Sequence, residues 1–271
     1  MSEELLDFNS IKKYEKQFLD IATSIRNKIN NLELKKRKIR TIDVSNQYAI
    51  DLVADNTIDE YLIDFPGYVI SEEREINKNE IENNELIVVI DPIDGSSNAS
   101  RGIGYWSFSA ALVYRGKVQL GVVVDQVQGW RYTANEYENP KLKITDNYEI
   151  DLLNDVDINN SFGTKANNYS SSIICFNSHD GPEVSFRHLR NYGSSALSIC
   201  HVASGSIDAY IDGEDIMLKP WDLLAGEYIS KKSSCFISRR DSQGLFAATG
   251  VLISKNVDLY NELKKIFVYF P

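Results

Sequence analysis

A run of five consecutive apolar residues, Leu86-Ile87-Val88-Val89-Ile90, constrains the fold of this chain most strongly. A continuous apolar run of this length is typical of a β-strand that is buried on both faces. The run leads directly into Asp91-Pro92-Ile93-Asp94-Gly95, which combines carboxylates with turn residues. We therefore expect a strand, buried on both faces, whose carboxyl end carries two aspartates on a tight turn.

Periodicity and turn residues outline the rest of the chain. Apolar residues recur every three or four positions from Ile11 to Asn30, which is typical of an amphipathic helix. After the apolar run at 86–90 we expect an antiparallel meander, and then alternating helices and strands of α/β type. The expected helices cover 11–30, 50–63, 194–204, 221–230 and 258–267, and the expected strands cover 68–70, 86–90, 108–114, 118–125, 129–134, 171–176, 207–212 and 250–254.

Two polar stretches are expected to be irregular. Residues 74–85 are charged and read as a loop, and residues 135–160 read as a connection between two halves of the chain, 1–145 and 146–271. Asp258 is a plausible cap for the last helix. The basic run Lys35 to Arg40 is interpreted as a solvated surface rather than a ligand contact.

Composition excludes several classes of partner. The net charge of −10 on 271 residues argues against nonspecific nucleic-acid binding and against attachment to anionic membranes. Neither a signal peptide nor a membrane span is visible in the sequence, so neither is expected. The three cysteines form no CxxC pair, so neither a zinc site nor a disulfide framework is indicated. A cytoplasmic protein is expected, and an anionic substrate remains compatible with bound cations.

The aspartates that follow the expected strand at 86–90 suit a metal ion. Asp91 and Asp94 project from one turn, and hard carboxylate oxygens so placed favour magnesium or manganese. Two buried like charges are costly unless cations neutralise them. The N–H groups of Gly95 and Ser96 could point at a phosphate if a helix begins there. The competing interpretation is an ordinary surface turn, since Asp-Pro and Asp-Gly are common turn sequences.

Three further acidic positions could complete such a site, although each has an ordinary explanation. Glu72 and Glu73 follow a short expected strand and could be a solvated surface pair. Asp222 opens an expected helix, where a helix cap is the default. Asp51 lies at the start of another expected helix, where capping or solvation would also account for it.

Taken together, these segments resemble the inositol monophosphatase family, within the larger group of metal-dependent, lithium-sensitive phosphatases. Three blocks carry the resemblance, namely Ser71-Glu72-Glu73, the segment from Asp91 to Asn98, and the segment from Trp221 to Gly226. It covers the chain from about Ile11 to Phe267, and the compact first half is most similar to archaeal inositol monophosphatase/fructose-1,6-bisphosphatase. The resemblance implies a layered αβαβα sandwich that combines α+β and α/β halves.

The same resemblance implies a role for each matching residue. Glu72, Asp91 and the carbonyl of Ile93 would hold one Mg²⁺, while Asp91, Asp94 and Asp222 would hold another. Two or three Mg²⁺ per site are implied, with Mn²⁺ as a possible substitute. Ser96, paired with Asp51, would orient and deprotonate the attacking water. The phosphate and alcohol parts of the substrate would meet Gly95, Ser96, Ser97, Arg190, Gly193, Ser194, Ser195 and Asp212.

The sequence departs from the family pattern at three places. Ser96 stands where the family usually has Thr, which keeps the hydroxyl but removes a methyl group. The match over Thr41 to Ile50 is loose, and Asp43 is an alternative to Asp51. The loop between Asp212 and Trp221 is longer than in animal inositol phosphatases, which affects the expected substrate contacts.

The expected function is Mg²⁺-dependent hydrolysis of a small-molecule phosphate ester, inositol 1-phosphate and/or fructose 1,6-bisphosphate, by metal-activated water. The alternative enzyme is a 3'(2'),5'-bisphosphate nucleotidase acting on phosphoadenosine phosphate, which would need Tyr105 or Trp106 at the pocket to stack on adenine. The alternative of another class is a non-catalytic metal- or phosphate-binding protein. The family resemblance also favours a homodimer.

Overall fold

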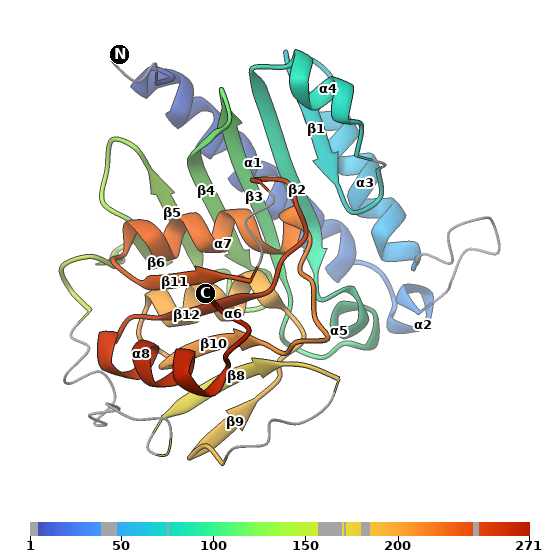
Figure 1. The fold of residues 1–271 in the computed structure, drawn as a ribbon. Coiled ribbons are helices and arrows are strands. Elements are labelled where there is room, and N and C mark those ends of the chain that lie inside the picture. The colour runs from blue at the N-terminus through green and yellow to red at the C-terminus, as the bar shows by residue number, and fades with distance from the viewer. Residues whose placement is uncertain are drawn as a thin grey trace.

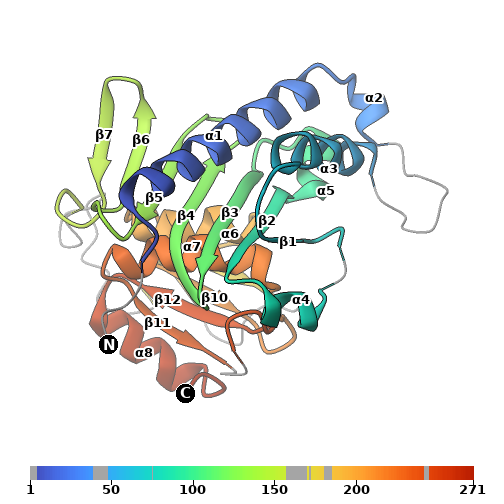
Figure 2. The same ribbon diagram turned by 90° about the horizontal axis from the view of Figure 1, so that it is seen from above.

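The structure, a computed structural model, describes residues 5–38, 48–74, 76–156, 170, 172–179, 185–240 and 244–271. Two β-sheets alternate with three layers of helices, so the expected αβαβα sandwich is confirmed (Figures 1 and 2). Figure 2 shows the layers in order from α1 to α8. Among the described helices, none is long and apolar enough to cross a membrane.

The first sheet contains the predicted buried strand, β2, next to its edge strand β1, and has seven strands in the order of the sequence. Its first pair is parallel and the others are antiparallel, which confirms the meander. Its strands are β1 (Tyr68–Ser71), β2 (Leu86–Asp94), β3 (Ser107–Tyr114), β4 (Lys117–Asp125), β5 (Arg131–Asn135), β6 (Lys141–Thr145) and β7 (Tyr148–Asp151). All of β2 after Leu86 is buried, as a strand covered on both faces requires.

Helices α1 (Phe8–Asn30) and α3 (Ala49–Leu62) cover one face of this sheet. The Asp7 side chain caps α1 by accepting the Ser10 N–H at 3.1 Å. The apolar stripe of α1 is fully buried, and burying each large aliphatic or aromatic side chain stabilises the fold by roughly 1.5–3 kcal/mol. Three short helices, all on connections, complete the first half: α2 (Leu34–Arg37), α4 (Lys78–Asn83) and α5 (Ser96–Arg101).

Helices α6 (Ser195–Ala203) and α7 (Pro220–Lys232) form the middle layer between the two sheets. They pack closely because a small residue lies at the contact: a Cβ added to Gly226 would come within 3.1 Å of the Ala196 carbonyl oxygen. Gly121 allows a similarly close approach where α7 crosses β4, since an added Cβ would come within 2.9 Å of the Ala225 carbonyl oxygen. Gly226 therefore permits the close packing of α7 on α6, and Gly121 permits its close packing on the first sheet.

The second sheet has five strands in the order β11-β12-β10-β8-β9, and α8 (Val257–Ile266) covers its outer face. Its members are β8 (Ile173–Asn177), β9 (His188–Arg190), β10 (Ala209–Asp212), β11 (Phe236–Arg239) and β12 (Val251–Ser254). Parallel and antiparallel pairs are mixed, consistent with the expected α/β character of this half. The division at residue 145 stays a prediction, and the first sheet continues to Asp151 in β7.

Three local expectations were wrong. The expected loop at 74–85 contains α4, which is capped by the Asn77 side chain and buries no residue, so it lacks an apolar stripe. The expected connection at 135–160 contains the β6–β7 hairpin, in which the buried Leu142 pairs with the partly buried Ile150. The last helix is capped by Asn256, which accepts the Asp258 N–H at 2.9 Å, and not by Asp258 itself.

Candidate metal centre

A β-bulge at the end of β2 turns two aspartates toward the same side. In a regular strand, residues three apart point to opposite faces of the sheet. Here Asp91 pairs with Ser109 and Asp94 with Ser107, so β2 has one residue more than β3 over this stretch. Asp91 is 2% exposed, and its Oδ1 accepts the Ile93 N–H at 2.9 Å, which fixes the turn.

The third carboxylate comes from the first turn of α7. One oxygen each of Asp91, Asp94 and Asp222 lie within 4.8 Å of one another, an arrangement able to hold a metal ion. Asp222 also caps its helix, because its Oδ2 accepts the Lys219 N–H at 2.8 Å. Its Oδ2 cap bond is therefore compatible with a place in the cluster, and the role of Asp222 as a metal ligand stays a prediction.

Burial and mutual repulsion make these carboxylates difficult to ionise without a cation. The pKa of Asp91 lies well above its usual value because the group is buried and because Asp94, Asp222 and Glu72 add negative charge. Burial, followed by the charge of Asp94, raises the pKa of Asp222 to about 8. A divalent cation would remove this repulsion, and three carboxylate oxygens suit a hard ion. The residues present therefore fit magnesium or manganese.

Asp94 is held by a shell of donors that connects both halves of the chain. Its Oδ2 accepts the Ser194 hydroxyl at 2.5 Å, the Ala196 N–H at 2.9 Å and the Ser107 hydroxyl at 3.1 Å. Among the described residues, its Oδ1 accepts one bond, from the Ser195 N–H at 3.2 Å. The start of α6 thus orients this carboxylate and leaves Oδ1 less occupied than Oδ2.

Glu72, the predicted ligand after β1, belongs to a second acidic group beside the cluster. Its side chain is exposed, but its pKa is raised by partial burial and by the charges of Asp51, Asp94 and Asp55. Glu72 lies outside the group of oxygens within 4.8 Å of one another. Its role as a ligand, with the Ile93 carbonyl, stays a prediction.

Asp55 was not singled out from the sequence, although it follows Asp51 by four residues on α3 and therefore shares its face of the helix. Its buried Oδ1 has no hydrogen-bond partner among the described residues. Burial raises the pKa of Asp55 to about 6. Glu73, whose pKa burial raises to about 7, also responds to the charge of Asp55.

Asp51 and Ser96, the predicted catalytic pair, lie on helices that pack against each other, α3 and α5. The Asp51 carboxylate is 8% exposed and accepts the Tyr48 N–H at 2.9 Å. No direct hydrogen bond joins these two described side chains, so the pair stays a prediction. Asp43, the alternative to Asp51, lies outside the described residues.

Two glycines, Gly95 from the first half and Gly193 from the second, bring the predicted phosphate-binding and substrate-binding segments into contact. Gly95 has φ +95° at the start of α5, and an added Cβ would come within 2.8 Å of the Gly193 carbonyl oxygen. Asn98 joins these segments, because its Nδ2 donates to the Tyr192 and Tyr105 carbonyl oxygens at 2.7 and 2.8 Å. Ser97 is exposed on α5. The structure thus brings Gly95 and Gly193 together beside Asp94.

Arg190 and Asp212 lie on the second sheet. Arg190 ends the edge strand β9, and its guanidinium donates to the Leu189 carbonyl. Asp212 ends β10 and is fully buried, with its carboxylate accepting the Val251 N–H and the Tyr210 hydroxyl, both at 2.9 Å. Burial raises the pKa of Asp212 to about 7. Substrate contact by either residue stays a prediction.

A layered αβαβα fold with a buried carboxylate cluster at the end of β2 is the arrangement that the sequence predicted for a metal-dependent phosphatase. The model of the inositol monophosphatase family matches residues 12–267. The chain therefore belongs to the inositol monophosphatase family, whose members are phosphatases acting on small phosphate esters. This confirms the family and the phosphoric monoester hydrolase class that the sequence predicted.

Two relatives share about a quarter of their aligned residues with this chain. A Nus factor SuhB of Pasteurella multocida is 24% identical over 90% of this chain and 93% of its own length. The fructose-1,6-bisphosphatase/inositol-1-monophosphatase of Archaeoglobus fulgidus is 26% identical over 83% of this chain and 84% of its own.

Solved structures agree with the fold. A Pyrococcus horikoshii protein with similarities to inositol-1 monophosphatase superposes with a TM-score of 0.75, at 21% identity, over 94% of this chain and 98% of its own. An IMPase of Thermotoga maritima gives a TM-score of 0.71, at 18% identity, over 96% and 99% of the two chains.

Proposed function

We propose that this protein is a Mg²⁺-dependent phosphatase of small sugar or polyol phosphates, with inositol 1-phosphate and fructose 1,6-bisphosphate as its first candidate substrates. The observation that carries the proposal is the convergence of Asp91, Asp94 and Asp222 within 4.8 Å. The choice of substrates is supported by the Archaeoglobus fulgidus relative, because its name combines both activities.

The chain offers ligands for two ions. Asp91, Asp94 and Asp222 would hold one Mg²⁺, and Glu72, Asp91 and the Ile93 carbonyl would hold another, with Mn²⁺ as a substitute. When bound, such ions lower the pKa of a coordinated water and neutralise charge on the phosphate. Ser194 and Ser107 hold Asp94 in position through their hydroxyl groups.

Asp51 would take up the proton of the attacking water, with Ser96 between them as the orienting hydroxyl. Burial raises the pKa of Asp51 to about 6, while the hydrogen bond from the Tyr48 N–H lowers it. A carboxylate with a pKa close to neutrality is ionised at pH 7 and still accepts a proton readily. This pKa supports the assignment of Asp51 as the base.

The turn from Gly95 into α5 would bind the phosphate. The first N–H groups of a helix have no partner within that helix, and Gly95, Ser96 and Ser97 supply them here. The alcohol part of the substrate would meet Gly193, Ser195 and the residues predicted on the second sheet, Arg190 and Asp212. The contact between Gly95 and the Gly193 carbonyl supports this arrangement because it places the two segments side by side.

Phosphate release from three compounds tests the proposal: inositol 1-phosphate, fructose 1,6-bisphosphate and phosphoadenosine phosphate, each with and without Mg²⁺. We expect Mg²⁺-dependent release from at least one of the first two. Asp94→Asn, which keeps the side-chain volume, should reduce turnover by about 100-fold or more because it removes a metal ligand. Asp146→Asn, in an exposed turn, is the matched control and should retain full activity.

Two other results of this assay would each contradict a different part of the proposal. Hydrolysis of the nucleotide alone would contradict the substrate class and favour the nucleotidase. The two aromatic residues that could stack on adenine are engaged with the protein, since Trp106 is 4% exposed in the core and Tyr105 stacks on Tyr192 at 4.5 Å. Calorimetric Mg²⁺ binding without phosphate release from any compound would favour a non-catalytic binding protein.

A further inference from the structure

We propose that Tyr210 is a positioning residue, which orients the Ser195 hydroxyl for a hydrogen bond with a hydroxyl group of the substrate. The pair would then favour phosphate esters of polyols over esters whose alcohol part carries no further hydroxyl. The inference rests on the proposed function and adds a residue that the sequence did not single out. Tyr210 lies on β10 and Ser195 begins α6, so the pair joins the second sheet to the middle layer.

Three side chains surround the Tyr210 hydroxyl. Asp212 Oδ1 lies 2.9 Å from it, Ser195 Oγ lies 3.1 Å from it, and Asn177 Nδ2 lies 3.3 Å from it. Tyr210 is 1% exposed. A side chain buried in this way does not touch the substrate itself, so Tyr210 would act through Ser195.

Asp212 fixes the buried end of this chain of hydrogen bonds. Its carboxylate accepts the Val251 N–H at 2.9 Å and the Asn177 Nδ2 at 3.0 Å, in addition to the Tyr210 hydroxyl. Asn177 lies directly opposite Asp212 in the parallel pair of β8 and β10. The sheet therefore holds Asp212 and Asn177 in place, and both keep the Tyr210 oxygen at a fixed position.

Ser195 lies at the other end of the chain, one hydrogen bond from the carboxylate cluster. Its N–H donates to Asp94 Oδ1 at 3.2 Å, and the residue is only partly buried. Gly193, two residues earlier, lies against Gly95 at the start of α5. An ester whose phosphate lies at the cluster would therefore have its alcohol part beside Ser195.

The Ser195 hydroxyl has hydrogen-bonding capacity left for a ligand. A serine hydroxyl offers one donor and two acceptor positions. Within the described residues, Tyr210 is the one side chain that bonds to Ser195 Oγ. This bond selects one of the three staggered rotamers open to a serine. A hydroxyl oriented in advance loses less freedom when a substrate hydroxyl binds to it.

The ratio of kcat/KM for inositol 1-phosphate to kcat/KM for phenyl phosphate tests the proposal. Phenyl phosphate carries no hydroxyl on its alcohol part, and fructose 1,6-bisphosphate replaces inositol 1-phosphate if the wild type prefers it. Tyr210→Phe should lower the ratio by about fivefold or more, because it releases the hydroxyl that meets the polyol. A general disturbance of the fold would lower both kcat/KM values and leave the ratio unchanged.

Ser195→Ala covers the case in which Tyr210→Phe disturbs folding, as judged by the thermal midpoint. It should lower the ratio at least as much as Tyr210→Phe, since it removes the hydroxyl itself. The double variant should lose no more than Ser195→Ala alone, because Tyr210 acts through Ser195.

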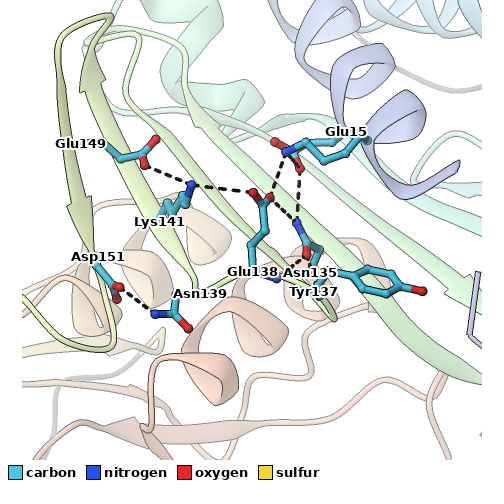
Figure 3. Close-up of polar contacts among 9 residues, drawn as sticks. Glu15, Asn135, Tyr137, Glu138, Asn139, Lys141, Glu149 and Asp151 are labelled. Carbon is cyan, nitrogen blue, oxygen red and sulfur yellow. Dashed lines mark hydrogen bonds and ion pairs between the residues drawn. The ribbon is translucent and has the colours of Figure 1, made fainter. Parts of the chain in front are cut away.

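Two tyrosines serve as matched controls, one in each half of the chain. The Tyr260 hydroxyl bonds to Ser238 Oγ at 2.7 Å, which is the same kind of pair between α8 and β11. The Tyr137 hydroxyl donates to the Leu6 carbonyl at 2.5 Å, beside the polar network around Asn135 (Figure 3). Tyr260→Phe and Tyr137→Phe should both keep the wild-type ratio.

An unchanged ratio in a folded Tyr210→Phe or Ser195→Ala protein would overturn this inference and leave the proposed function standing. Additive losses in the double variant would overturn it too, since Tyr210 would then not act through Ser195. A wild-type protein that releases phosphate from neither inositol 1-phosphate nor fructose 1,6-bisphosphate would overturn the proposed function, and this inference with it.

Discussion

At the scale of single residues, the orientation of Asp94 depends most directly on Ser194. The Ser194 hydroxyl donates to Asp94 Oδ2 at 2.5 Å, and both side chains are almost fully buried. Removing a hydrogen bond to a metal ligand commonly costs 10–100-fold in metal affinity. Ser194→Ala should therefore weaken Mn²⁺ binding by roughly 10-fold or more, as measured by calorimetry.

Ser204→Ala is the matched control, because this hydroxyl lies at the end of the same helix and donates to the His201 carbonyl instead. It should bind Mn²⁺ like the wild type. If Ser194→Ala also binds Mn²⁺ with wild-type affinity, the orienting role of Ser194 is wrong.

Asp212 makes the stability of the fold depend on pH. Burial raises its pKa from 3.8 to about 7, so the folded state holds this proton more tightly than the unfolded state does. The stability gained from that proton is complete below pH 3.8 and is lost as pH rises through 7. Between pH 5 and 8 the loss should be about 2 kcal/mol or more.

Asp212→Asn isolates this contribution, because an amide imitates the neutral carboxyl and does not titrate. Urea unfolding in EDTA at both pH values should show a smaller decrease in the free energy of unfolding for the variant. The other buried carboxylates titrate in both proteins, so the comparison removes their contribution except for the part of the Asp222 pKa shift that the charge of Asp212 causes. The same decrease in both proteins would show that Asp212 does not titrate in this range.

The sequence was most informative about residues within recognisable motifs. Asp91, Asp94 and Asp222 lie in the blocks that carry the family resemblance, and the structure brings all three together. Asp55 and Ser107 were missed because neither lies in such a block. Ser107 contributes only through its position opposite Asp94 on β3, and Asp55 through its helical spacing from Asp51.

At the scale of elements, α7 must approach β4 closely for Asp222 to reach β2. Gly121 permits this approach, since an added Cβ would lie 2.9 Å from the Ala225 carbonyl oxygen. Gly121→Ala should therefore displace α7, lowering the free energy of unfolding by about 1–3 kcal/mol and weakening Mn²⁺ binding. Urea unfolding and calorimetry measure the two effects.

Gly104→Ala provides the comparison, because its added Cβ would meet only Val127 at an ordinary 3.6 Å. This variant should keep both its stability and its affinity for Mn²⁺. A fully stable Gly121→Ala protein with unchanged Mn²⁺ binding would mean that the contact between α7 and β4 does not position Asp222.

Elements with strong periodicity were predicted well, and those without it were not. The apolar stripe of α1 and the apolar run of β2 can be recognised in the sequence, and both elements lie close to where they were expected. Helix α4 buries no residue, and the strands of the β6–β7 hairpin bury only Leu142, so neither leaves a clear hydrophobic pattern. The bulge in β2 is also invisible in the sequence, because it depends on the register with β3.

At the scale of the whole molecule, the middle layer of helices lies between the two sheets and contributes to the carboxylate cluster at the end of β2. Helix α7 supplies Asp222, and the start of α6 supplies the N–H groups that hold Asp94. The order of the layers could be expected only from the family resemblance, since periodicity does not specify how two sheets share helices. The division at residue 145 and the homodimer stay predictions.

Anomalous scattering from crystals soaked in Mn²⁺ tests the central claim most directly, because it locates the ion without relying on activity. We predict a peak enclosed by the carboxylates of Asp91, Asp94 and Asp222, and its loss in Asp94→Asn crystals. Wild-type crystals with no peak among these three side chains at saturating Mn²⁺ would contradict the account.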